Sequence, residues 1–290
     1  MPKTFDFSPE SIAQLAQDDA ARALREDLGT GDLTASLIDP TRMARARVLA
    51  RESAVVCGQA WVHAAVLQCD PQAQITWQVQ DGQRCQVNQV VFEVTGRAQA
   101  LLTAERTALN FLQLLSGVAT KTATYAAIVA GTQAKIVDTR KTLPGLRLAQ
   151  KYAVRTGGGT NHRVGLYDAI LIKENHIAAA GGIPQVMAQA AHLAAQADFV
   201  EIEVETLVQL AQALDCGAKM VLLDNMDLPT LHEAVRINQG RAILEISGGV
   251  TLEGLRALAE TGVDRISIGT LTKDVQATDY SMRFEPFTGA

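Results

Sequence analysis

The chain has 290 residues, of which 48% are hydrophobic and 20% charged, and its formal net charge is -5. This is enough chain for one large or two ordinary globular domains with a proper core. Aromatic residues make up only 4% of this acidic chain, which argues against a nucleic-acid groove built from basic patches and stacking platforms. No apolar run approaches the roughly 18 residues of a membrane span, and the start lacks a signal pattern. We therefore expect a cytoplasmic enzyme whose partners include neither nucleic acid nor membrane.

The first hundred residues contain three segments typical of strands, ARARVLARESAVVCG, AQITWQVQ and QVVFEVTG. Turn signals such as Asp81-Gly82 separate them. Near the other end of the chain, SMRFEPF resembles a last strand that returns to this domain. We predict an N-terminal α+β domain, an open-faced sandwich, over residues 1–113, joined by residues 276–290.

A helical segment is expected to link this domain to the rest of the chain. Its apolar residues recur at helical spacing and are Leu101, Leu109, Leu112, Leu115 and Ala119. The spacing predicts one or two long helices, and Gly117 and Gly131 are the candidate breaks.

From about residue 135 onward, short apolar runs alternate with helical stretches. The runs AKIVD, AILIK, FVEIEVE, MVLLD, AILEIS and RISIG start at residues 134, 169, 199, 220, 242 and 265. Such spacing fits successive strand-helix units in a parallel sheet. Six or more units favour a closed barrel, so we predict a TIM-like α/β barrel, incomplete or seven-stranded, over residues 114–275. An open doubly wound sheet is the alternative.

The four cysteines are scattered, without the spacing of a metal site. We interpret them as reduced thiols. Cys216 could be a nucleophile, but without a partner His nearby in sequence we expect a small buried residue.

A basic window from Thr139 to Tyr167 holds six Lys or Arg, one His and no acid. In an acidic protein, such a window is typical of a cleft for a small polyanion, although a solvated basic face is the commoner use of clustered charge. Within it, Arg140 suits bidentate capture of a carboxylate or phosphate, and Lys141 offers a point charge for a pyrophosphate oxygen.

The three glycines of GGGTNHR indicate either a flexible linker or backbone that must approach something closely, and His162 and Arg163 follow at once, where they could bind an anion. A structural role is the commoner use of a lone His. Lys173 ends the next apolar run and could be a Schiff-base amine, an anion ligand or a paired surface charge.

The acids of FVEIEVE, which are Glu201, Glu203 and Glu205, share one side of a strand by its two-residue alternation. A barrel lumen cannot bury three unpaired carboxylates, so we expect them to face cations or to mark a strand end. One of them, together with Asp224, would suit Mg²⁺. Alternatively, Asp224 or Asp227 caps the following helix.

The last two strands are followed by glycine turns in EISGGVTLEGL and SIGTLTKD. Backbone N–H groups at such turns bind phosphate, and barrels often carry a phosphate site there.

Taken together, ERTALNFLQLLSG, DTRKTLPGLR, GGGTNHRVGLYDAILIKENH, EIEVE, LLDNM, EISGGV and SIGTLT resemble the quinolinate phosphoribosyltransferase family in order and over nearly the whole chain. The early EDLGTGDLT fits too. The resemblance implies that quinolinate attacks C1 of phosphoribosyl pyrophosphate, pyrophosphate leaves, and the 2-carboxylate is lost as CO₂. The product is nicotinate mononucleotide, used in NAD biosynthesis.

The resemblance also implies roles for individual residues. The expected quinolinate ligands are Arg106, Thr139, Arg140, His162, Arg163 and Lys173. Lys141 and Lys173 would steady phosphoribosyl pyrophosphate, while Glu203 and Asp224 would orient Mg²⁺, through water, and the ribose hydroxyls. The 5-phosphate would lie against Ser247, Gly248, Gly249 and Gly269. Family members place the substrate between two subunits, so a homodimer or larger assembly is expected, with Arg106 acting across the interface.

Other functions stay open. A related transferase would use nicotinate without decarboxylation, a non-catalytic protein would use the basic window only to bind, and an aldolase-type barrel would use Lys173 as its amine.

Overall fold

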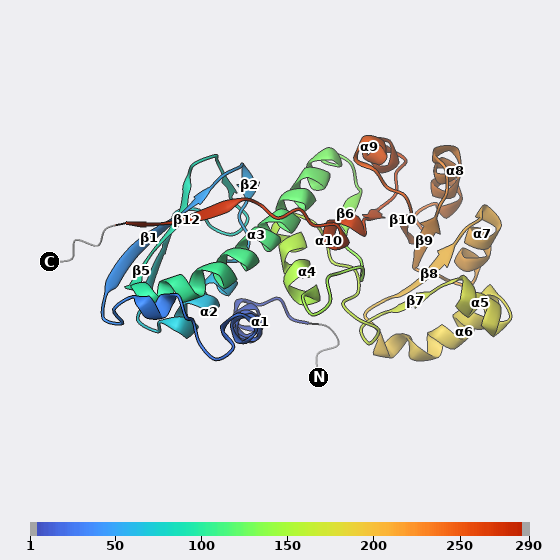
Figure 1. Ribbon diagram of the computed structural model, residues 1–290. Helices are drawn as coiled ribbons and strands as arrows, with labels where there is room; N and C mark the ends of the chain where they lie inside the picture. Colours follow the sequence, from blue (N-terminus) through green and yellow to red (C-terminus); the bar gives the residue numbers. More distant parts are fainter. Residues whose placement is uncertain (1–4, 286–290) are drawn as a thin grey trace. The chain divides into compact units, whose positions relative to one another are not determined.

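The computed structural model describes residues 5–285, and the chain divides into two units (Figure 1). The sandwich unit comprises Phe7–Ala123, Leu143–Gly158 and the C-terminal segment from Asp274. The barrel unit is built mainly from Thr124–Thr142 and Gly159–Lys273.

The sandwich unit contains a four-stranded antiparallel sheet in the order β12-β1-β5-β3. Its strands are β1 (Met43–Ala50), β3 (Gln74–Trp77), β5 (Val90–Arg97) and β12 (Tyr280–Glu285). Two short strands, β2 (Ala54–Val55) and β4 (Arg84–Cys85), pair separately. The helices are α1 (Pro9–Leu28), η1 (Ala35–Leu37), α2 (Gln59–Cys69), α4 (Arg147–Thr156) and the first part of α3 (Ala98–Ile128).

The two faces of this sheet differ in polarity. Ala46 and Val48 are fully buried and lie opposite Val94 and Phe92. The alternate residue Arg47 points to the other face, where it pairs with Glu285 at 2.8 Å. One apolar and one charged face define the open-faced sandwich predicted from the sequence. The predicted last strand is confirmed as β12 up to Glu285, while Pro286 and Phe287 lie outside the described residues.

Six parallel strands form the sheet of the barrel unit, in the order β6-β11-β10-β9-β8-β7. They are β6 (Lys135–Val137), β7 (Ile170–Ile172), β8 (Val200–Val204), β9 (Met220–Asp224), β10 (Ile243–Ser247) and β11 (Arg265–Ser267). The first strand pairs with the last, so the sheet curls round, and a bridge from Val137 to Thr160 adds a seventh position beside β6. Among the described strands, no ladder joins β6 to β7. The prediction of an incomplete α/β barrel is confirmed.

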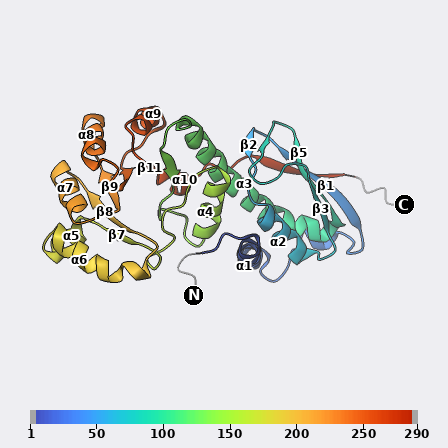
Figure 2. The ribbon, with the colours of Figure 1, turned by 180° about the vertical axis from the view of Figure 1, so that it is seen from behind.

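Helices between the strands surround this sheet, and Figure 2 shows α6 to α9 arranged around its outer side. They are α5 (Glu174–Ala180), α6 (Ile183–Leu193), η2 (Ala194–Gln196), α7 (Leu207–Asp215), α8 (Leu228–Asn238), α9 (Leu252–Glu260) and α10 (Thr270–Lys273). The core strand β9 is apolar over Met220 to Leu223, all buried, as expected for a strand covered on both sides.

The linking segment is one uninterrupted helix, α3, of 31 residues. Gly117 therefore does not break it. Instead this glycine lets the backbone of Gln276 approach, because a Cβ at Gly117 would lie 2.2 Å from the Gln276 carbonyl oxygen. Gly131 lies after the helix and has a φ of +81°, the left-handed conformation that glycine tolerates.

All four cysteines are free, as predicted, but the expectation that Cys216 is buried is wrong. Cys216 is exposed at the C-terminal end of α7.

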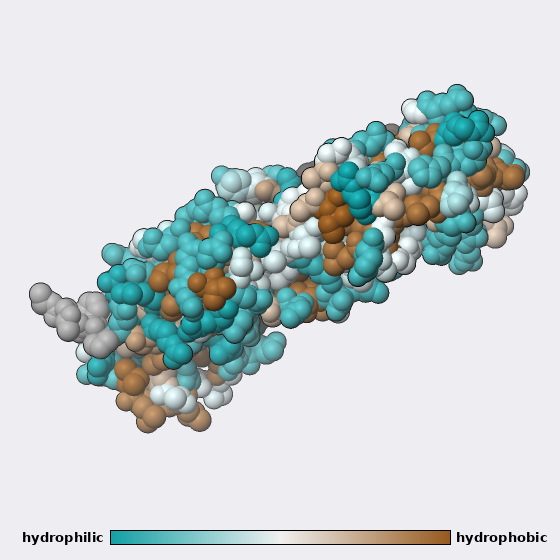
Figure 3. Space-filling view, turned by 90° about the horizontal axis from the view of Figure 1, so that it is seen from above, coloured by the Kyte–Doolittle hydropathy of each residue, from teal (hydrophilic) through white to brown (hydrophobic). Residues whose placement is uncertain are grey.

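On the face shown in Figure 3, hydrophobic patches are scattered among hydrophilic side chains. Within residues 5–285, no helix has both the length and the apolarity to span a membrane.

Replacing Gly117 with Ala should destabilise the protein by about 1–3 kcal/mol, because the new methyl group overlaps the Gln276 backbone. Helix propensity alone favours Ala over Gly by about 1 kcal/mol, so the expected sign opposes that preference. The matched control is Gly254→Ala in α9, where the nearest atom to a new Cβ is Thr251 Oγ1 at 3.7 Å. Urea unfolding measures both, and a midpoint for Gly117→Ala at or above the parent value would contradict the assignment.

Candidate functional site

A cavity of about 330 Å³ lies where strands of the barrel unit end. Its charged and hydroxyl-bearing walls are Thr139, Arg140, Lys141, His162, Arg163, Lys173, Glu203, Glu245, Ser247 and Ser267. The carboxyl ends of parallel strands meet at one edge, and α/β barrels carry their active sites there. Most of the residues predicted from sequence are thus brought together in one place.

The cations of this cavity lie close enough to repel one another. Burial lowers the pKa of Arg163, and the charge of Arg140 lowers it further. Arg163 is fixed by donating from Nη1 to the carbonyl of Ala169 at 3.2 Å. Lys173 Nζ lies 2.8 Å from Glu203 Oε2, so the two side chains form an ion pair. Two guanidinium groups held together in this way favour binding of an anion.

Two carboxylates share the ends of neighbouring strands. Asp224 does not line the cavity, yet its pKa is raised by burial and then by the charge of Glu203, so the two acids lie near each other. The helix cap that follows is Asp227, whose Oδ1 accepts from the Thr230 N–H at 3.0 Å. Asp224 is therefore not needed as a cap. Two neighbouring carboxylates of this kind are suited to a cation.

Beneath the cavity lies a buried cluster of charged groups that the sequence reasoning largely missed. Glu201 and Glu245 are both fully buried, and burial is the main reason that the pKa of each rises to about 7. Glu201 Oε2 lies 2.7 Å from His162 Nε2, and Glu245 Oε2 lies 2.9 Å from Arg265 Nε. Glu205 instead lies exposed in the turn after β8.

The ligand atoms of His162, Glu201 and Glu245 lie within 4.8 Å of one another, a spacing that could hold a metal ion. Glu245 already contacts Arg265, however, and Glu201 already contacts His162. We interpret the cluster as a buried network of polar side chains that partner one another. An acid inside the apolar run AILEIS and an Arg beginning RISIG were the sequence signals that could have revealed Glu245 and Arg265.

The predicted phosphate residues lie at the ends of the last two strands. Ser247 lines the cavity and is followed by Gly248 and Gly249, with φ of +96° and +57°. A Cβ at Gly248 would lie 2.3 Å from Asn225 Oδ1, and the φ of +96° is itself unfavourable for residues other than glycine. At Gly269, a Cβ would lie 3.0 Å from Lys141 Cδ, which places this glycine against a cation of the cavity.

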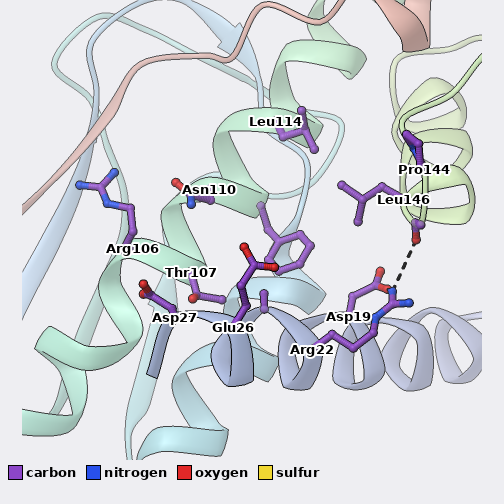
Figure 4. Close-up of a pocket in the computed structure, with 13 residues that line it drawn as sticks. Asp19, Arg22, Glu26, Asp27, Arg106, Thr107, Asn110, Leu114, Pro144 and Leu146 are labelled. Carbon is purple, nitrogen blue, oxygen red and sulfur yellow. Dashed lines mark hydrogen bonds and ion pairs between the residues drawn. The ribbon is translucent and has the colours of Figure 1, made fainter. Parts of the chain in front are cut away.

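Arg106 is not part of this cavity. It lies on α3 in the sandwich unit and lines a separate cavity of about 540 Å³. Figure 4 shows Thr107 and Asn110 beside it on the same helix, with Glu26 and Asp27 on α1. The expectation that Arg106 serves a partner subunit stays a prediction.

The fold and cavity define an α/β-barrel protein whose cavity brings arginine and lysine side chains together with carboxylates. The sequence matches the N-terminal domain of quinolinate phosphoribosyl transferase over residues 32–116 and its C-terminal domain over residues 118–283. The chain belongs to this family.

Relatives match over nearly their whole length. The chain is 42% identical to the probable nicotinate-nucleotide pyrophosphorylase [carboxylating] of Bacillus subtilis, over 89% of each chain. It is also 42% identical to the nicotinate-nucleotide pyrophosphorylase [carboxylating] of Mycobacterium leprae, over 92% of this chain and 96% of the relative. The solved structure of the nicotinate-nucleotide pyrophosphorylase from Francisella tularensis matches with a TM-score of 0.92 and 42% identity, over 98% of this chain and 100% of that one.

The raised pKa of Glu245 should make stability depend on pH. Because the folded state keeps a proton on Glu245 up to about pH 7, against 4.5 for the ordinary carboxyl, stability should fall as pH rises between these values. Glu245→Gln removes this group, so its stability should fall less steeply than that of the parent protein. Thermal unfolding at several pH values compares the two slopes, and an equal or steeper slope in the variant would count against the assignment.

Asp227→Ala should cause a small loss of stability because α8 loses its N-cap. Asp224→Ala should cause none, because the raised pKa of Asp224 means that its charged form is disfavoured in the folded state. Denaturant midpoints at pH 7 test this pair. The opposite ranking would mean that Asp224, not Asp227, is the structural acid.

Proposed function

We propose that this protein transfers the phosphoribosyl group of phosphoribosyl pyrophosphate to quinolinate and releases CO₂, pyrophosphate and nicotinate mononucleotide, a step of NAD biosynthesis. The observation that carries the proposal is the crowding of Arg140, Arg163 and Lys173 in one cavity beside Glu203. Quinolinate is a dianion, and cations held close in a partly buried cleft favour a ligand with two carboxylates over one with a single carboxylate. The names of the relatives support the same reaction.

The quinolinate site in this proposal is the guanidinium pair with Lys173 and the Thr139 hydroxyl. Arg140 and Arg163 can each present two parallel N–H donors to a carboxylate. Lys173, held by Glu203 at 2.8 Å, adds a charge whose position is fixed. Fixed donors lower the ordering cost of binding and orient the ring nitrogen for attack.

Phosphoribosyl pyrophosphate would take the opposite wall. Lys141 would contact its pyrophosphate oxygens, and the turns at Ser247 and Gly269 would hold the 5-phosphate through backbone N–H groups. Glu203 and Asp224 fit a divalent cation, since Mg²⁺ binds one or two carboxylates together with substrate phosphates. When bound, Mg²⁺ would neutralise charge on the departing pyrophosphate.

In this proposal the residues stabilise the charges that develop during the reaction, and no covalent bond to the protein is formed. As pyrophosphate leaves, positive charge develops at ribose C1, and Glu203 and Asp224 would stabilise it. The new bond makes the pyridine nitrogen cationic, and this stabilises the electron pair left at C2 when CO₂ departs. A proton from water then replaces the lost carboxylate at C2, which gives nicotinate mononucleotide. The role of the protein in that second step is to hold the ring through its carboxylate contacts.

Arg106 would complete the quinolinate site of a partner subunit in a homodimer or larger assembly. Its placement in the sandwich unit, in a cavity of its own, is compatible with service to a second copy. A cytoplasmic location, expected from the sequence, also stays a prediction.

The proposal is tested by incubating the protein with phosphoribosyl pyrophosphate, Mg²⁺ and quinolinate labelled at the 2-carboxylate, with nicotinate in parallel. Matched release of CO₂ and mononucleotide from quinolinate is expected. Product from nicotinate alone would indicate the non-decarboxylating relative, and no product from either would indicate a binding protein.

Arg140→Ala should weaken quinolinate binding by about tenfold to a hundredfold, while binding of phosphoribosyl pyrophosphate with Mg²⁺ changes little, because lost hydrogen bonds to a charged group cost about 1.5–3 kcal/mol. Titration calorimetry measures both. The matched control is Arg236→Ala, since Arg236 is an exposed arginine of α8 paired with Glu233 outside the cavity. Equal loss for both substrates would refute the assignment of Arg140.

A further inference from the structure

His162 was expected to contact a substrate carboxylate, but its ring is used inside the protein. Nδ1 accepts a hydrogen bond from the backbone N–H of Arg163 at 2.8 Å. Nε2 lies 2.7 Å from Glu201 Oε2, and the residue is only 8% exposed. The edge of the ring packs against Phe199. Both nitrogens therefore already have partners.

These partners fix the chemical form of the ring. A nitrogen that accepts from a backbone N–H must present a lone pair, so Nδ1 carries no proton. Nε2 then carries the single proton of the ring, and this N–H donates a hydrogen bond to Glu201 Oε2. This neutral tautomer directs its N–H toward a buried carboxylate, so that donor is not available to an anion in the cavity.

The His162 ring helps to fix the loop in which it lies, residues 161–168. This loop has no regular secondary structure, yet four successive backbone N–H groups donate to side chains. The N–H of His162 donates to Asp138 at 2.8 Å, and that of Arg163 donates to His162. Those of Val164 and Gly165 donate to Asp168 at 2.6 and 2.8 Å. A loop held at every step presents Arg163 in one orientation.

Glu201 anchors this arrangement from below. It comes from β8, and its neighbour in the cluster, Glu245 of β10, lies 3.6 Å from the same Nε2. The ring thus connects the loop to two strands of the barrel. Moving the ring would leave a buried carboxylate without its donor, which is costly.

We infer that His162 is a positioning residue: through Nδ1 it fixes the backbone of Arg163, and thereby aims that guanidinium at the quinolinate carboxylate, without touching the substrate itself. The inference rests on the proposed function for the identity of the ligand. Its geometric part, the neutral Nε2–H tautomer, does not.

Two substitutions distinguish the roles of the two ring nitrogens of His162. Asn at this position places an acceptor near Nδ1, whereas Gln places a donor near Nε2. If His162 acts through Nδ1, His162→Asn should keep quinolinate affinity within about threefold, and His162→Gln should lose about tenfold, the cost of one hydrogen bond. If Nε2 contacted the substrate, the ranking would be reversed, which would overturn the inference.

A double-mutant cycle gives a readout that a general loss of structure would not produce. With Arg163→Ala already in place, adding His162→Gln should change quinolinate affinity by less than about twofold, because the residue through which His162 acts is gone. Additive losses would show that His162 contacts the ligand independently. Phosphoribosyl pyrophosphate affinity, measured with the same samples, should stay constant.

Nitrogen-15 NMR of the imidazole groups in the full chain tests the tautomer directly, with His162→Gln used to assign the signal. The neutral Nε2–H form is expected both without ligand and with quinolinate bound. A doubly protonated ring in either state would overturn the inference. Failure of the parent protein to bind quinolinate would instead reject the proposed function and leave the tautomer result standing.

Discussion

Charge buried inside the barrel has to be balanced, and this requirement organises the site. Glu201 and Glu245 are removed from water, and an unpaired carboxylate there would be very costly. Arg265 and His162 neutralise or hydrogen-bond them from β11 and from the loop before β7. These four side chains therefore join strands that are distant in sequence, and they fix the loop that carries Arg163.

In and beside the cavity next to this buried cluster, groups of like charge lie close together. Arg140 lies near Arg163, and Glu203 lies near Asp224. Like charges placed together are characteristic of functional sites, because the stability they cost is recovered when the ligand binds. The ends of the barrel strands and the loops that follow them hold these groups in place.

Local patterns in the sequence were sufficient for the strands of the barrel, the long helix α3 and most cavity residues, because hydrophobic periodicity and glycine turns are encoded locally. What the sequence could not show were contacts between distant segments. From the sequence, Gly117 is a candidate helix break, whereas in the structure it allows the Gln276 backbone to pack against α3. The sequence likewise does not show that Glu201 and the Arg163 N–H contact the two nitrogens of His162. Alternation identifies the face on which Glu201 lies but not the residue across the lumen that pairs with it.

The most direct test of the account compares how tightly the protein binds a dianion and a monoanion of the same ring. Titration calorimetry with quinolinate and with nicotinate, at equal pH and low salt, isolates the contribution of the second carboxylate. The account predicts that quinolinate binds at least about tenfold more tightly, since the second carboxylate gains charge-assisted hydrogen bonds. Equal affinities would contradict the claim that crowded cations define this site.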